Sequence, residues 1–214
     1  MAPTLTSFAA PTGGAAFLGA ALRKAMRKSI LALALLAVTG TATARGDIEP
    51  LARTCNGCHG LGGVSAGPTM PSIGGLPKSY LQNIMKQWKY DERLGVTMSR
   101  IVKGLSDDEI DALGAYFAAK AWVPAAQAAA PTQLAKGKSV ISENCEDCHG
   151  ATGSDPDVGV PKINGQWSKY MELELEKYRS GVFDMPHRKM KRSARELKEA
   201  DVSAAARYFG AQQK

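Results

Sequence analysis

The sequence predicts an all-α fold built from two tandem copies of one small domain. The first observation is a repeat: the hexapeptide at residues 55–60 (CNGCHG) returns 90 residues later at residues 145–150 (CEDCHG). The second is that apolar side chains recur at three- and four-residue spacing after each copy, as on one face of a helix. The third is that no run alternates between apolar and polar residues as a half-buried strand would. An internal duplication of a helical unit accounts for all three.

The first 44 residues have the pattern of a leader that precedes the folded domains. They contain four basic residues and no acidic one, then an apolar run at 30–38 and the small residues Ala42-Thr43-Ala44. This order is typical of a cleaved secretory signal peptide, with Met1 or Met26 as its start. Nine apolar residues are too few to span a bilayer. We therefore expect a periplasmic protein with no transmembrane segment in the mature chain.

Much of the positive net charge of the chain lies in the predicted leader. The whole chain of 214 residues carries a formal net charge of +7, which by itself would favour nucleic acid or an anionic membrane as a partner. Residues 45–214 carry only +3. We expect no nucleic-acid partner. The composition, 44% hydrophobic and 22% charged, is that of an ordinary globular protein.

The repeat also places the domain boundaries. Tyr80 recurs as Tyr170 at an offset of 90, whereas Leu105 recurs as Leu197 at an offset of 92, so two residues have been inserted between these points in the second copy. The segment between the copies is rich in alanine, holds two prolines and has no charge, as a linker would. The predicted organisation is a leader at 1–44, a first domain at 45–120, a linker at 121–133 and a second domain at 134–214.

Helix signals occur in both copies. Ser106 and Glu109 have the spacing of a capping box, in which the serine side chain accepts from the backbone of the third helical residue and the glutamate side chain reaches back. Apolar spacing predicts the helix behind this box and a second helix pair earlier in each copy. The predicted helices span about 106–120, 199–211, 80–88 and 170–178, and Gly- and Pro-rich stretches at 60–77 and 150–165 are predicted loops.

All four cysteines lie in two Cys-x-x-Cys pairs, and a histidine follows each pair directly. A zinc site made from two such pairs needs roughly 15–20 residues between them, whereas 86 residues separate Cys58 from Cys145. A disulfide within one pair would close too short a loop to stabilise much. Covalent attachment of haem gives a role to both cysteines and to the histidine of each motif. The two thiols form thioethers with the haem vinyl groups, and the imidazole binds the iron. The sequence predicts two covalently bound haem c, attached to Cys55, Cys58, Cys145 and Cys148, with His59 and His149 on the iron.

Each iron also needs a sixth ligand. Met98 lies in a Gly-containing segment expected to loop over the distal face of the first haem, seven residues before a leucine of the repeat. Met190 lies seven residues before the matching leucine, so the offset of 92 predicts it for the second iron. Met185 and His187 remain alternatives at this site, because both side chains are able to bind iron.

Methionine opposite histidine predicts electron transfer without catalysis. A thioether raises the reduction potential relative to a second imidazole, and a six-coordinate iron has no open position for a substrate. The glycines at 60–63 do not spell a dinucleotide-binding motif, so no FAD site is expected in this chain. No catalytic residue is predicted.

Basic residues crowd the segment around the second distal methionine, and two interpretations of them remain open. They form either a solvated helical face or a landing site that attracts an acidic electron partner. The residues are Arg188, Lys189, Lys191, Arg192, Arg195 and Lys198.

With these motifs, each half resembles a class I cytochrome c domain, and the tandem pair resembles dihaem cytochromes of the c-four type. Three stretches are more similar to the cytochrome subunit of flavocytochrome c sulfide dehydrogenase: residues 98–106, residues 115–125 with their AYF and WVPA sequences, and Gly165-Gln166-Trp167. The resemblance covers residues 49–213. The resemblance implies that Met98 and Met190 are the sixth ligands of the two irons. The segment at 184–190 departs from the family's pattern, because it contains two methionines and a histidine near the expected ligand position.

The resemblance implies a periplasmic chain that docks on an FAD-containing flavoprotein. The flavoprotein oxidises sulfide, and the two haems pass electrons singly to a soluble or membrane-bound acceptor. The chain would then be no enzyme by itself, because the catalytic site lies on its partner. The first alternative is a free dihaem carrier of the c-four type that delivers electrons to a terminal oxidase. An alternative of another class is an exported binding module stabilised by zinc or disulfides.

Overall fold

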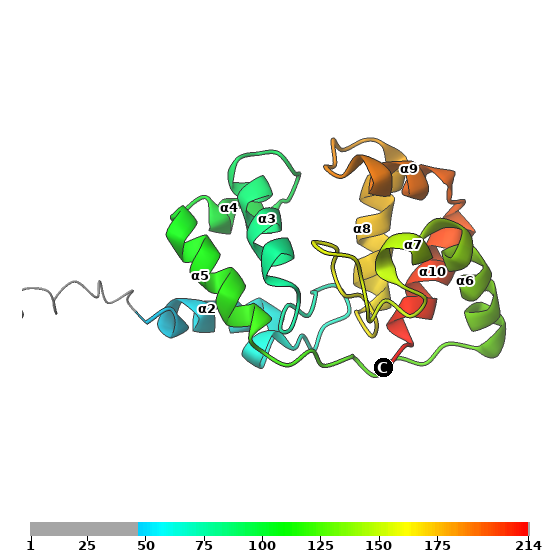
Figure 1. Cartoon of the computed structure of the whole chain (residues 1–214), viewed down its shortest axis with the longest axis horizontal. Coiled ribbons are helices and arrows are strands. Elements are labelled where there is room, and N and C mark those ends of the chain that lie inside the picture. Colours follow the sequence, from blue (N-terminus) through cyan, green and yellow to red (C-terminus); the bar gives the residue numbers. More distant parts are fainter. Residues whose placement is uncertain (1–46, 214) are drawn as a thin grey trace, which may run out of the picture. The chain divides into compact units, whose positions relative to one another are not determined.

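The computed structural model describes residues 47–213, which belong to one compact unit; the predicted leader at 1–44 lies outside the described residues. Every regular element in this range is a helix, which confirms the all-α prediction (Figure 1). None of the helices within residues 47–213 combines the length and the apolar character needed to cross a membrane. In chain order the elements are α2 (Glu49–His59), the short 3-10 helix η1 (Leu61–Gly63), α3 (Lys78–Lys89), α4 (Thr97–Val102), α5 (Asp107–Ala118), α6 (Pro131–Asn144), α7 (Glu146–His149), α8 (Ser168–Ser180), α9 (Arg188–Glu196) and α10 (Glu199–Gly210).

The helices repeat in the order that the duplication predicts. The pairs α3 and α8, α4 and α9, and α5 and α10 occupy matching positions in the two copies. The single helix α2 corresponds to α6 and α7 together, because the backbone leaves helical geometry at Cys145, where φ is −130° and ψ is −32°. Two tandem domains of one kind therefore make up residues 47–213.

Several observed helices lie outside the predicted helical ranges, among them α4, α6 and α9. The segment expected to loop past Met98 forms the short helix α4 instead. Its counterpart α9 is also helical, and α6 was not predicted at all. α6 begins at Pro131, inside the stretch predicted as linker, because a proline suits the first turn of a helix, where its missing N–H would have no partner.

Each domain has its own apolar core, and the two cores use matching positions. In the first domain, Leu81 of α3 packs with Leu113 and Phe117 of α5. In the second, Met171 of α8 packs with Ala205 and Phe209 of α10. Because these residues correspond at the offsets of 90 and 92, the duplication is visible in the packing as well as in the motifs.

The predicted capping box at the start of α5 is present. The backbone N–H of Glu109 donates to Ser106 Oγ at 3.2 Å, and Glu109 Oε2 accepts from the backbone N–H of Ser106 at 2.7 Å. Two N–H groups that the helix itself leaves unpaired are thereby satisfied.

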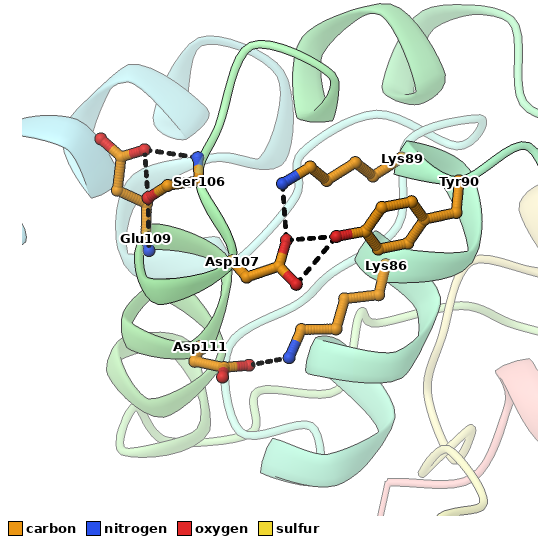
Figure 2. A network of polar contacts seen from close by, with 7 residues as sticks. All are labelled: Lys86, Lys89, Tyr90, Ser106, Asp107, Glu109 and Asp111. Carbon is orange, nitrogen blue, oxygen red and sulfur yellow. Dashed lines mark hydrogen bonds and ion pairs between the residues drawn. The ribbon is translucent and has the colours of Figure 1, made fainter.

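Beside this cap, charged side chains hold the start of α5 against the end of α3 (Figure 2). Lys89 Nζ lies 2.5 Å from Asp107 Oδ1, and the Tyr90 hydroxyl donates to the same carboxylate at 2.8 Å. One turn further on, Lys86 Nζ lies 2.8 Å from Asp111 Oδ1. The negative charge of Asp107 also suits the positive end of the α5 dipole.

Candidate haem sites

The first attachment site is built on one turn of α2. Cys55, Cys58 and His59 stand at positions i, i+3 and i+4, which brings their side chains to one side of the helix. Neither thiol is in a disulfide. The helix ends at His59. The next residue, Gly60, has a φ of 76° and lies so close to Val64 that no side chain fits there.

The histidine of this site is held in a definite tautomer. His59 is 8% exposed, and its Nδ1 lies 2.9 Å from the carbonyl oxygen of Pro71. A carbonyl only accepts, so Nδ1 carries the proton and the lone pair of Nε2 remains free for a metal. Burial lowers the pKa of His59, and the hydrogen bond to Pro71 offsets part of this effect. The imidazole is therefore neutral at pH 7, as a ligand must be.

The second site repeats this arrangement across α6 and α7. Cys145 and Cys148 are free thiols, and burial raises the pKa of Cys145 to about 11. His149 is 9% exposed, its Nδ1 lies 3.3 Å from the carbonyl oxygen of Pro161, and burial lowers its pKa. Its ring lies 6.3 Å from that of Phe209, in the core of the second domain.

Sequence reasoning overlooked the two carbonyl groups that orient the histidines. Pro71 and Pro161 each follow their histidine by 12 residues. The prolines were visible as part of the repeat, so the signal was present. Their role was not, because a carbonyl oxygen belongs to the backbone and leaves no mark on the residue type.

Haem c fits the side chains that both copies present. Each copy offers two free thiols three residues apart, followed at once by a buried, neutral imidazole with an available Nε2. Within residues 47–213, no group of three or more His, Cys, Asp or Glu side chains is placed to hold a metal ion directly. When bound, haem c supplies a centre that gains and loses one electron. The protein holds and tunes that centre.

The predicted distal ligands lie on matching short helices. Met98 is in the first turn of α4 and Met190 in the first turn of α9, and both are half-buried. At the offset of 92, the buried Val102 of α4 corresponds to the buried Ala194 of α9. The connectors before these helices, 90–96 and 181–187, are equally long. The helix starts Thr97 and Arg188 differ by 91, so the helix boundaries do not decide whether the second inserted residue precedes Met190, and its equivalence to Met98 stays a prediction from the repeat.

The competing residues near Met190 have other neighbours. Met185 is 1% exposed and packs with Tyr178 and Ala194 in a small apolar cluster, against which Met190 also rests. His187 is exposed, and its Nε2 lies 3.3 Å from Nε2 of Gln87 in the first domain. The choice of distal ligand stays a prediction, with Met190 favoured by its place in the repeat.

Two buried polar contacts join the domains, and the sequence did not predict either. Gln166 and Ser72 exchange a pair of hydrogen bonds at 2.9 and 3.0 Å. Arg93 of the first domain is 6% exposed and donates to the Tyr178 hydroxyl at 2.7 Å and to Glu174 Oε2 at 2.8 Å. Gln166 lies in one of the stretches that carried the family resemblance.

Comparison with known proteins finds a cytochrome family match for each of the two domains. Residues 49–117 match the family model described as "Cytochrome C oxidase, cbb3-type, subunit III", and residues 134–211 match the model described as "Cytochrome c". The chain is similar in fold to the crystal structure of reduced recombinant cytochrome c4 from Pseudomonas stutzeri, with a TM-score of 0.67 and 24% identity. That match covers 78% of this chain and all of the other.

Among curated proteins, cytochrome c4 of Pseudomonas aeruginosa is 30% identical over 199 residues, covering 86% of this chain and 98% of the relative. The cytochrome subunit of sulfide dehydrogenase from Chlorobaculum tepidum is 35% identical over 81 residues, which is 38% of this chain and 71% of the relative. The expected resemblance to that subunit is thus partial, while the resemblance to cytochrome c4 spans both domains. The binding-module alternative is wrong, because both halves are cytochrome c domains. The chain belongs to the dihaem class I cytochrome c4-like family and carries two covalently bound haem c.

Proposed function

We propose that this chain is the electron-accepting cytochrome subunit of a periplasmic flavoprotein complex that oxidises sulfide. The carrying observation is that the thiol and imidazole arrangement is present in both domains, which gives the chain two one-electron sites. Oxidation of sulfide to zero-valent sulfur releases two electrons, which two such sites accept together. The partial similarity to a sulfide dehydrogenase cytochrome subunit supports this choice of donor.

Within this proposal, each haem is held by the residues of its own domain. Cys55 and Cys58 bind the first haem covalently, with His59 and Met98 on its iron. The second haem is held by Cys145, Cys148, His149 and Met190. Both irons are then six-coordinate, so the chain transfers electrons, while the FAD-containing partner carries out the chemistry on sulfide.

Export completes the proposal. The leader at 1–44 directs the chain to the periplasm and is removed after Ala44. Haem attachment in an exported chain also keeps the four thiols from forming disulfides.

The test is anaerobic titration of the native protein with sulfide. The holoprotein is purified from its own source under mild conditions, and the visible spectrum is followed as sulfide is added. The proposal predicts that a flavoprotein co-purifies and that both haems become reduced at one sulfide per complex. A holoprotein that is isolated alone, and that sulfide fails to reduce after the co-expressed flavoprotein is added back, would contradict it.

A free dihaem carrier is the second candidate, and one observation favours it. The match to cytochrome c4 covers 86% of this chain, whereas the match to the sulfide dehydrogenase subunit covers 38%. This candidate predicts a chain that is purified without flavin and that a terminal oxidase oxidises directly. The sulfide titration separates the two functions, because only the first predicts reduction by sulfide.

A further inference from the structure

Helix α9 presents a strongly basic face to solvent. Four of its side chains line a shallow hollow together with Glu196. They are Arg188, Lys191, Arg192 and Arg195, and the exposed Lys189 and Lys198 flank them. These six residues are called the α9 basic face.

The opposite side of the same helix is apolar and packed. Met190 rests against the cluster of Tyr178 and Met185, and Ala194 is 1% exposed within it. Leu197, directly after the helix, is also buried. α9 packs against α8 (Figure 1), and Arg188, Arg192 and Arg195 remain exposed to solvent.

Most of this positive charge has no partner in the described part of the chain. Lys191 lies 3.2 Å from Asp184, and no other member of the α9 basic face makes an ion pair with residues 47–213. The contrast with the first domain is direct. Lys103, the counterpart of Arg195 at the offset of 92, pairs with Asp91 at 2.7 Å.

The stability of the helix does not explain these residues. Arg188 and Arg192, and likewise Lys191 and Arg195, are like charges four residues apart, a spacing that disfavours a helix. Basic residues in a first turn also oppose the helix dipole, and α9 has no acidic residue there. By contrast, α5 and α10 both have acidic first turns. The placement of these basic residues therefore disfavours the helix, and no ion pair within the fold offsets it for most of them. Such unfavourable local choices are expected at functional sites.

We propose that the α9 basic face docks an acidic one-electron redox protein against the second haem domain. Opposite charge raises the rate of encounter and fixes the orientation of the two proteins. Met190 lies on the packed side of the same helix, so a partner on the basic face lies close to the distal side of the second haem. One electron leaves the reduced chain and reduces the oxidised metal centre of the partner, with no bond made or broken. The inference rests on the electron-carrier role and on the proposed assignment of Met190 to the second iron, and not on the identity of the donor.

The counterpart helix supplies a matched control. α4 occupies the same position in the first domain but has one basic residue, Arg100, at the place of Arg192. Replacing Arg188, Arg192 and Arg195 by glutamine removes three positive charges from the basic face. Replacing the exposed Lys78, Arg100 and Lys138 by glutamine removes the same charge elsewhere.

The experiment measures oxidation of the reduced holoprotein by plastocyanin, an acidic blue-copper protein, in a stopped-flow instrument. At low ionic strength we expect the α9 variant to react about tenfold more slowly than the wild type, and the control variant to stay within about twofold. At high salt the three rates should converge. Both variants should keep the methionine–iron charge-transfer band, which shows that the second site is intact.

Three results would overturn the proposal. One is a wild-type rate that does not change with ionic strength, and another is an equal loss of rate in the two variants. The third is an unchanged plastocyanin rate in the α9 variant together with lost binding to vesicles of anionic lipid, which would make the face a membrane contact. In each case sulfide reduction of the complex would be unaffected, so the proposed donor is tested separately.

Discussion

Met185 and Met190 lie five residues apart, but they occupy different surroundings. Met185 is 1% exposed among Tyr178 and Ala194, as a core residue is. Met190 is half-buried in the first turn of α9, as Met98 is in the first turn of α4. The assignment of the second sixth ligand therefore depends on the register of the repeat and not on residue type alone.

Replacing these methionines singly tests the assignment. Met190→Ala should remove about half of the methionine–iron charge-transfer band of the oxidised protein, because one of two methionine-bound irons loses its thioether. Met98→Ala is the matched variant and should remove the other half. Met185→Ala should keep the full band but lower the unfolding free energy by about 2–5 kcal/mol, since it opens a cavity in a packed cluster. A full band in Met190→Ala would refute the assignment.

Arg93 is the other residue whose role depends on the second domain. Its side chain is 5% exposed and its partner Glu174 is 18% exposed, so their charges are poorly screened by water. Arg93→Gln would leave Glu174 without this partner, and we expect the unfolding free energy to fall by about 3 kcal/mol.

Chemical denaturation of the holoprotein measures the effect of Arg93→Gln. The control is Arg179→Gln, which breaks a more exposed pair with Glu176 within one helix and should change stability little. Equal stability of the Arg93 and Arg179 variants would show that the contact between the domains contributes nothing.

At the scale of the elements, the sequence predicted the helices that carry strong local signals. The capping box of α5 and the apolar spacing of α3 and α8 were sufficient, because both depend on residues within two turns. α4 and α9 were missed, since they are short and contribute few buried side chains. The contacts of Arg93 with Tyr178 and of Gln166 with Ser72 join residues 85 and 94 positions apart, and no local pattern encodes them.

The linker is fixed by close contacts with two glycines that the duplication places in matching loops. Gly75 lies against Trp122, and Gly165 lies against Pro124. A Cβ on Gly165 would stand 2.2 Å from Pro124 Cβ, and its φ is 64°. The linker is therefore packed onto the domains along this stretch, which its composition alone did not predict.

Substituting Gly165 by alanine tests this contact. Both the clash and the positive φ should lower the unfolding free energy, by about 2–4 kcal/mol in total. Gly159→Ala is the control, because its φ is 81° but nothing lies within 4 Å of the added Cβ. Thermal unfolding followed by circular dichroism compares the two variants. A smaller loss for Gly165→Ala than for Gly159→Ala would contradict the packing of the linker.

At the scale of the whole molecule, duplication has produced two similar haem domains with unequal surfaces. The cores share three matching positions and the Cys-x-x-Cys-His motifs correspond, whereas the α9 basic face has no equivalent on α4. The shared parts include the residues predicted to bind haem, which the repeated Cys-x-x-Cys-His motif made visible in the sequence. We propose that the unequal surfaces bind partners, and identifying them required the burial and ion pairing of individual side chains.

The central claim is that each chain carries two haems, one on each Cys-x-x-Cys-His motif. Intact-mass spectrometry of the denatured, exported protein tests it most directly, because thioether bonds survive unfolding. The account predicts the mass of residues 45–214 plus two haems, and one haem fewer in the double variant Cys145→Ala, Cys148→Ala. A wild-type chain without covalent haem, or a double variant that keeps two haems, would contradict it.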